Sequence, residues 1–211
     1  MVSNRYHIIL ASNSPRRKEL LAGLDIPFEI RVIEGIDESY PHTLATKEIA
    51  GYISKKKTDA YRQSMADDEL IITADTIVIL ADQVMGKPKD ADEAYKMLHQ
   101  LSGRTHQVIT GVCLTTHDRQ VSFSVETDVT FKTLSDEEIN YYVEHYKPFD
   151  KAGAYGIQEW IGHVGVTGMN GSYFNVMGLP VQRIYEALKT FLMIEMLNVE
   201  VFLNNPLHIQ N

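Results

Sequence analysis

The chain has 211 residues, a length that fits one α/β domain or two smaller lobes and favours a single cooperative core. Its composition is that of an ordinary globular protein, and its net charge of -8 argues against non-specific binding to nucleic acid or to an anionic membrane, because both need a basic face. The single cysteine, Cys113, excludes an internal disulfide, and neither a signal-peptide pattern nor an apolar stretch of about 20 residues is present, so we expect a cytoplasmic protein.

The first predicted elements are a strand and a helix. Residues 8–10 are apolar and of strand type, and Ser14 followed by Pro15 is typical of a helix start. The first turn of that helix holds Arg16 and Arg17, where the helix dipole prefers acidic side chains. The two arginines therefore indicate either a bound anion or acidic partners elsewhere in the chain.

Two acidic residues follow the next predicted strand. Apolar and charged residues alternate over residues 28–33, which is typical of a half-exposed strand. The turn after this strand carries Asp37 and Glu38. These carboxylates fit either solvated loop charges or, for one of them, a metal ligand.

A helix is predicted from Thr43 to about Met65, and it carries a run of lysines. The apolar residues that recur there at helical spacing are Ile49, Tyr52, Ile53 and Ala60. Helical rotation places Lys56 near the centre of this apolar face and Lys57 at its edge, with Lys55 beside them. We expect at least one of these ammonium groups to reach a cleft, without a choice between them.

An aspartate interrupts the most apolar strand of the sequence. Residues 70–80 have the length and β-branched content of a strand that is buried on both faces, and Asp75 stands in the middle of it. An ionised carboxylate is costly there unless it is paired or bound to a metal. Asp75 is therefore a functional candidate, and the alternative is a hydrogen-bonded aspartate at a strand end or a bulge.

The rest of the chain alternates strands and helices with short turns. We expect a turn at 86–88 that presents Lys87, a helix capped by Asp90 and Glu93, strands over 108–115 and 121–131, a helix capped by Ser135 and Glu138, a strand or loop over 164–169, and a helix from about residue 180. The segment 150–158 is rich in glycine and small residues, which lets a backbone approach a ligand closely.

Together these residues point to phosphoryl chemistry. The positive groups are Arg16, Arg17, Lys87 and one of the lysines 55–57, and the negative groups are Asp75 with Asp37 or Glu38. Basic groups at a helix start suit a phosphate chain, and isolated carboxylates suit magnesium. The sequence has neither a Gly-x-x-x-x-Gly-Lys-Ser/Thr loop nor a Gly-x-Gly-x-x-Gly pattern, so it supports neither a P-loop enzyme nor an ordinary Rossmann domain.

Six segments resemble one known family. They read Leu-Ala-Ser-Asn-Ser-Pro-Arg-Arg-Lys-Glu-Leu-Leu, Ala-Asp-Thr-Ile-Val, Gly-Lys-Pro, Leu-Ser-Gly-Arg-Thr-His-Gln-Val, Asp-Lys-Ala-Gly-Ala-Tyr-Gly-Ile-Gln and Asn-Gly-Ser-Tyr-Phe-Asn-Val-Met-Gly-Leu-Pro. In this order they resemble the Maf family of nucleoside triphosphate pyrophosphatases, from about Ile8 to Phe191. The resemblance implies an inosine triphosphatase-like α/β fold, in which a long mixed sheet in two lobes, flanked by helices, surrounds a central cleft.

The resemblance also implies roles for individual residues. The ending Ala-Tyr-Gly-Ile-Gln resembles the branch that cleaves dTTP and UTP, in which Arg16, Thr76 and Gln158 would select the base. Asp75, Lys87, Arg17 and Lys57 match catalytic positions, with Asp75 as proton acceptor. Phosphate-binding positions match Ser12, Arg16, Arg17, Lys57 and Lys87, and a Mg²⁺ or Mn²⁺ ion would be held by Glu38 and Asp75. Two departures, Gly35 and Thr58, remove no group that the chemistry needs.

The expected partner is a nucleoside triphosphate, and the resemblance implies a homodimer. We expect residues 1–191 to form one domain and 192–211 to form an extension of unknown role. Two other functions fit the same residues: a non-catalytic nucleotide sensor that regulates cell division and septum formation, and a phosphatase for small sugar phosphates. Acidic Asp75 and Glu38 disfavour the sensor, because binding alone needs only the positive groups.

Overall fold

The computed structural model describes residues 6–191, through which a single mixed sheet runs. The strands are β1 (His7–Leu10), β2 (Glu29–Ile30), β3 (Glu69–Leu80), β4 (Gln83–Met85), β5 (Thr105–Thr115), β6 (Gln120–Phe131) and β7 (Val166–Asn170). Their order is β2-β1-β3-β5-β6-β7, and β4 lies beside β3. β1 is parallel to β2 and β3, whereas the other neighbouring strands are antiparallel. The predicted mixed sheet is confirmed.

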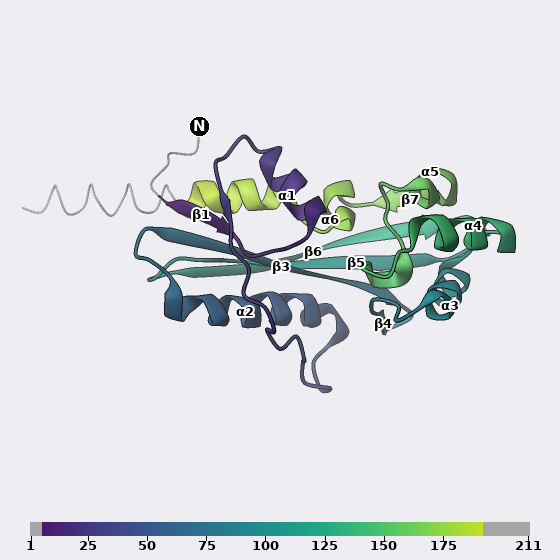
Figure 1. Ribbon diagram of the computed structural model, residues 1–211, viewed down its shortest axis with the longest axis horizontal. Helices are drawn as coiled ribbons and strands as arrows, with labels where there is room; N and C mark the ends of the chain where they lie inside the picture. Colours follow the sequence, from purple (N-terminus) through teal and green to yellow (C-terminus); the bar gives the residue numbers. More distant parts are fainter. Residues whose placement is uncertain (1–5, 192–211) are drawn as a thin grey trace, which may run out of the picture.

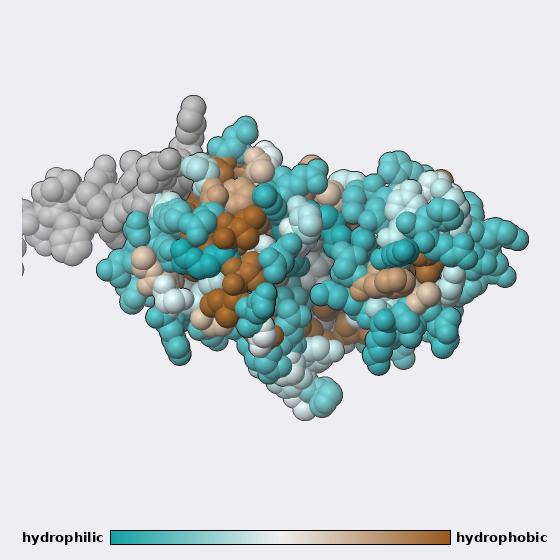
Figure 2. Space-filling view, in the orientation of Figure 1, coloured by the Kyte–Doolittle hydropathy of each residue, from teal (hydrophilic) through white to brown (hydrophobic). Residues whose placement is uncertain are grey.

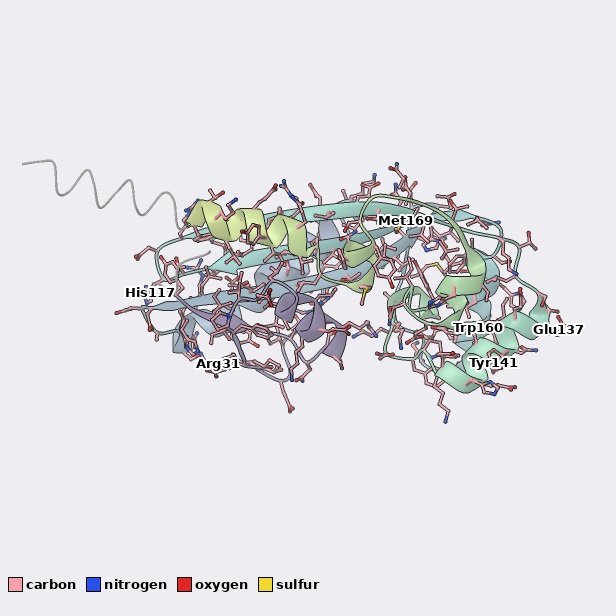
Figure 3. The ribbon with its side chains drawn as sticks, turned by 90° about the horizontal axis from the view of Figure 1, so that it is seen from above. Arg31, His117, Glu137, Tyr141, Trp160 and Met169 are labelled. Carbon is pink, nitrogen blue, oxygen red and sulfur yellow. The ribbon has the colours of Figure 1, made fainter. Side chains whose placement is uncertain are left out.

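Helices gather at the two ends of this long sheet. They are α1 (Pro15–Ala22), α2 (Ile49–Tyr61), α3 (Ala91–Leu101), α4 (Asp136–Tyr146), α5 (Trp160–Gly165), α6 (Tyr173–Met177) and a last helix described over residues 181–191. At one end α2 covers one face of the sheet, and α1 and the last helix cover the other (Figure 1). At the opposite end lie α3, α4 and α5. Figure 3 shows the two ends from above, with Arg31 in one lobe and Trp160 in the other.

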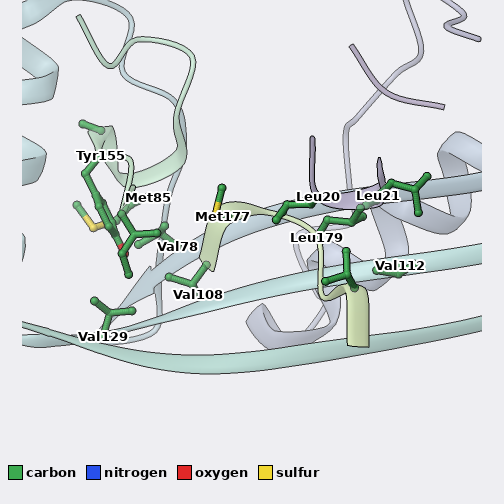
Figure 4. Close-up of a cluster of buried hydrophobic side chains, with 14 of the residues drawn as sticks. Leu20, Leu21, Val78, Met85, Val108, Val112, Val129, Tyr155, Met177 and Leu179 are labelled. Carbon is green, nitrogen blue, oxygen red and sulfur yellow. The ribbon is translucent and has the colours of Figure 1, made fainter. Parts of the chain in front are cut away.

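One apolar core joins the two lobes. Buried residues of β3 and β5 continue a single cluster from α1 to the far end of the sheet. In Figure 4, Met177 lies between Leu20 on one side and Tyr155 on the other. A second cluster, which includes Ile53 and Ile77, packs α2 onto the opposite face of β3. No helix within residues 6–191 is long and apolar enough to cross a membrane.

Local signals predicted most element ends correctly. The Ser14 hydroxyl caps α1, and both halves of the predicted capping box are present at α4. Two predictions were too long. The strand expected over 28–33 is only β2, since β1 offers it just Ile9 and Leu10 as partners. The helix expected from Thr43 to Met65 is α2, with 3-10 turns at Thr46–Glu48 and Arg62–Ser64.

The buried face of α2 differs from the predicted one. Tyr52, which the prediction placed on the apolar face, is 39% exposed, whereas Ser54 and Thr58 are buried. The hydroxyls of Thr58 and Thr73 lie 2.8 Å apart, and the Thr73 hydroxyl donates to the Ser54 carbonyl at 2.7 Å. Since these polar groups satisfy one another, they can be buried, and the helix turns Lys57 toward β3. The pair also explains why Thr58 is accommodated.

The predicted extension at 192–211 lies outside the described residues. The single domain expected over residues 1–191 stays a prediction.

Candidate active site

The cleft opens where β3 lacks a partner strand along one edge. β1 pairs with β3 as far as Leu10 opposite Ile72, and β4 begins its pairing at Val78. Within residues 6–191 no strand covers the interval between them on this edge. Asp75 and Thr76 lie in the interval, and they are the two residues of β3 that are not fully buried. The gap therefore accounts for an aspartate within an otherwise apolar strand.

Two adjoining hollows form the cleft, between the two ends of the molecule (Figure 2). The first hollow runs from the start of α1 to the loop at 34–38, and the second reaches between β3, β5 and α6 to the segment 150–158. All nine predicted site residues line the cleft. Ser12 and Glu38 line the first hollow, Asp75, Thr76 and Gln158 line the second, and Arg16, Arg17, Lys57 and Lys87 line both.

The Lys57 ammonium lies between two carboxylates. Its Nζ is 2.8 Å from Oδ1 of Asp75 and 2.9 Å from Oε1 of Glu38. Burial raises the pKa of Glu38, but the hydrogen bond and charge of Lys57, with Lys87 nearby, lower this pKa more, so Glu38 stays ionised. Lys57 rather than Lys56 is thus the lysine of the cleft.

The same two carboxylates fit a divalent cation. Among residues 6–191 there is no cluster of three or more His, Cys, Asp or Glu side chains that could enclose a metal. Glu38 and Asp75 nevertheless direct one oxygen each at a common point, the Lys57 ammonium. Magnesium commonly binds one or two carboxylates and takes its other ligands from water and substrate phosphates. The donor set is therefore suited to a cation that arrives with a phosphate ligand.

Lys56 and Asp37 hold the loop that carries Glu38. Lys56 Nζ lies 2.6 Å from Asp37 Oδ2 and donates to the Ser39 carbonyl at 2.9 Å. Gly35, which begins this loop, has a φ of 74°, a left-handed conformation that favours glycine. Of the two acidic residues in the loop, Asp37 therefore anchors the backbone, and Glu38 faces the cleft.

Arg17 fills the open edge of β3. Its Nε donates to the Gly178 carbonyl at 2.8 Å, Nη1 donates to the Ala74 carbonyl at 2.8 Å, and Nη2 donates to the Thr76 hydroxyl at 3.1 Å. Burial lowers the pKa of Arg17 and the charge of Asp75 raises it, and the guanidinium remains a cation. Arg17 thus joins the end of α6 to β3, the strand that bears Asp75.

Arg16 has the acidic partner that the sequence left open. Its Nη1 lies 3.3 Å from Oδ2 of Asp150, across the mouth of the cleft. Both side chains keep solvent access, at 25% and 62% exposure, so the pair can open to admit an anion. The Ser12 hydroxyl accepts from the Ser14 amide at 3.2 Å, which shapes the turn that leads into α1.

Sequence reasoning missed a charged network behind the segment 150–158. Lys151 is buried and contacts the carboxylates of Asp150 and Glu159. Glu159 in turn accepts a hydrogen bond from the Tyr142 hydroxyl. The only signal in the sequence is a lysine and a glutamate on either side of a run of small residues.

Comparison with known proteins finds relatives of similar sequence. A family model described as "Maf-like protein" matches residues 7–191. A protein from Parabacteroides distasonis named "dTTP/UTP pyrophosphatase" is 63% identical over 89% of this chain and 97% of its own length. A protein of the same name from Phocaeicola vulgatus is 65% identical over 88% of this chain and 96% of its own length. A solved dITP/XTP pyrophosphatase from Mycobacterium abscessus superposes with a TM-score of 0.37 at 16% identity, over 66% of this chain and 94% of that one.

Proposed function

Because the chain belongs to the Maf-like protein family, we propose that it is a hydrolase that converts dTTP and UTP to the nucleoside monophosphate and pyrophosphate. One observation carries this function: Lys57 joins Asp75 and Glu38 in a cleft whose rim is basic. A binding protein for phosphates needs the basic rim alone, whereas hydrolysis also needs a group that can accept a proton, which a carboxylate supplies here.

The first hollow receives the triphosphate. The start of α1 supplies positively polarised amides, and Arg16, Lys57 and Lys87 line the hollow with positive charge. No acidic residue stands in the first turn of α1, so nothing there repels a phosphate. Ser12 lies in the turn beneath and adds a hydroxyl to this wall.

The second hollow receives the base. Gln158 lines it, and its Oε1 is buried with no hydrogen-bond partner within the described residues. An amide that both donates and accepts matches the edge of uracil or thymine, which presents both kinds of group. Thr76 and Arg16 line the same hollow, which supports their assignment to base selection.

Asp75 acts as the general base. It takes a proton from a water molecule as that water attacks the α-phosphorus, and the bond from the α-phosphorus to the bridging oxygen breaks. Pyrophosphate leaves with its negative charge stabilised by Lys57, Lys87 and Arg16. A Mg²⁺ or Mn²⁺ ion held by Glu38 and Asp75 would supply Lewis-acid charge at the α-phosphate. Asp75 would then serve both as a ligand of that ion and as the proton acceptor.

We also propose that the protein works in the cytoplasm and as a homodimer. The single cysteine, Cys113, is buried and unpaired, which is compatible with a reducing cytoplasm. The domain at residues 1–191 would work as a homodimer, which light scattering of the purified chain tests directly.

The deciding experiment identifies the products released from a panel of nucleotides with and without Mg²⁺. Pyrophosphate from dTTP and UTP is expected; orthophosphate would point to a phosphatase, and nucleotide binding without product would point to a sensor. Asp75→Asn should nearly abolish release. Asp82→Asn, in the exposed turn after β3, is the matched control, since asparagine tolerates the φ of 64° there. Release by Asp75→Asn at the wild-type rate would contradict the assignment of the base.

A further inference from the structure

A buried lysine in the lobe away from the phosphate site is the centre of a closed network. Lys151 is 8% exposed, and its Nζ lies 2.7 Å from Asp150 Oδ1 and 3.1 Å from Glu159 Oε1. The other Glu159 oxygen accepts from the Tyr142 hydroxyl, which itself accepts from the Gly156 amide at 3.0 Å. The network therefore ties the segment 150–159 to Tyr142 of α4 at two residues, Gly156 and Glu159.

The protonation states fit these directions. Burial raises the pKa of Tyr142, and the hydrogen bond to Glu159 raises it further, so the hydroxyl keeps its proton and donates. Burial raises the pKa of Asp150, but the hydrogen bond and charge of Lys151 lower it more, so Asp150 stays ionised beside Arg16. Each polar group in the chain of contacts thus has a partner of the matching kind.

Both ends of the network meet residues that face the base. At one end, the second oxygen of Asp150 lies 3.3 Å from Arg16 Nη1. At the other end, Glu159 follows Gln158 directly, and a Cβ added at Gly156 would lie 2.9 Å from both Gln158 Nε2 and Glu159 Cδ. The Gly156 backbone therefore packs closely against both side chains, which couples the position of the Gln158 amide to that of Glu159.

A buried ammonium is a costly way to stabilise a loop. Apolar side chains of similar size commonly serve stability as well or better, whereas a fully paired charge fixes one arrangement of its neighbours. The Lys151 ammonium contacts Asp150 and Glu159 rather than Asp75, and Lys151 does not line the first hollow. Lys151 is therefore suited to fixing the positions of Asp150 and Glu159 rather than to contacting the phosphates.

We propose that Lys151 is a positioning residue for base selection, which acts through Asp150 on Arg16 and through Glu159 on Gln158. This inference rests on the proposed function for the identity of the base. It assigns selectivity to a lysine that also lines the second hollow but whose ammonium is bound by two carboxylates. One of these, Asp150, contacts Arg16, and the other, Glu159, follows Gln158 in the chain.

The test measures binding of dTMP and dGMP by calorimetry, so that it does not depend on turnover. Wild-type protein should prefer dTMP, and Lys151→Met should lower the ratio of the two affinities by about tenfold or more, since a misplaced amide no longer distinguishes the base edges. In turnover of dTTP, KM should rise while kcat changes by less than about threefold. Combining Lys151→Met with Glu159→Gln should add little, since both interrupt one chain of contacts.

The matched control is Lys132→Met, which removes a lysine 2.6 Å from Glu138 of α4 without touching segment 150–159. This control should keep the wild-type affinity ratio. A folded Lys151→Met with the wild-type ratio, or with a fall in kcat alone, overturns the inference. If that variant does not fold, Tyr142→Phe removes another link and must lower the ratio for the inference to stand. Wild-type protein without a preference for dTMP would instead contradict the proposed base, a separate outcome.

Discussion

Gly111→Ala should loosen the helix that carries Lys57. Gly111 pairs with Asp75 across β3 and β5, and a Cβ at Gly111 would lie only 2.3 Å from the carbonyl group of Ala50 and from the Gly51 amide nitrogen. Carbon contacts are comfortable at about 3.5 Å or more, so α2 and β5 must separate by about 1 Å. Overpacking of this kind costs about 2 kcal/mol, which for a chain of this size lowers Tm by about 4–8 °C.

The effect on turnover should exceed the effect on stability. Lys57 Nζ and Asp75 Oδ1 are now 2.8 Å apart, and a separation of about 1 Å takes this contact beyond hydrogen-bond range. Displacement by about 1 Å at a positioned catalytic group can cost about 100-fold in rate. Differential scanning fluorimetry and pyrophosphate release at 25 °C measure the two effects on one sample.

Gly168→Ala on β7 is the matched control. A Cβ there would lie 3.7 Å from the Thr130 side chain, an ordinary contact, and so this variant should melt and turn over almost as wild type does. If Gly111→Ala behaves like Gly168→Ala in both assays, α2 does not pack against Gly111 as closely as described. The packing of α2 on β5 then does not determine the position of Lys57 for catalysis.

Three further changes test other contacts. Lys57→Met removes the ammonium between the two acidic residues of the cleft and should lower kcat/KM for dTTP by about 10- to 150-fold, the equivalent of one charge-assisted contact, whereas the exposed Lys55→Met should leave it unchanged. Burial lowers the pKa of His106 from 6.5 to about 4, so its contribution to stability is complete above pH 6.5 and is lost as pH falls toward 4. The variant His106→Gln should therefore show a smaller decline of Tm between pH 6.5 and 4.5 than wild type. An equal decline in both proteins would contradict a buried neutral imidazole. The hydrogen bond from Arg31 lowers the pKa of Glu69, so this pair stabilises the fold above pH 4.5 and loses its effect below. Arg31→Met should lower the free energy of unfolding by about 2 kcal/mol at pH 7, as measured by thermal melting. This loss of stability relative to wild type should shrink on acidification.

Elements with a local signal could be predicted from the sequence. A helix start needs only a capping side chain and a few neighbouring residues, and Ser14 and Ser135 identified α1 and α4 correctly. The buried strand around Asp75 was equally readable, since an acidic residue in an apolar run is costly unless a partner compensates. The partner is Lys57, and its contacts depend on which face of α2 is buried. The spacing of apolar residues predicted this face wrongly, since Tyr52 is exposed and Ser54 and Thr58 are buried.

Contacts between distant segments could not be predicted in this way. The hydroxyl pair that buries Thr58 joins a helix to a strand, and neither residue looks unusual in its own segment. The network of Lys151 needs Tyr142 from α4, so no spacing within one segment reveals it. Resemblance to a family supplied site residues that local pattern did not, such as Thr76 and Gln158, because it carries information on the folded arrangement.

The gap in the edge of β3 explains why the cleft lies where it does. An uncovered strand edge exposes backbone groups and normally invites another strand. Here β1 pairs with β3 as far as Leu10 and β4 pairs with it from Met85, so within residues 6–191 the interval between them has no partner strand, and Arg17 reaches in to satisfy the Ala74 carbonyl. The arginine that covers the edge also brings positive charge beside Asp75. A long strand with two short, separated partners thus leaves Asp75 and Thr76 open to the cleft, where Arg16, Lys57 and Lys87 supply positive charge for an anion.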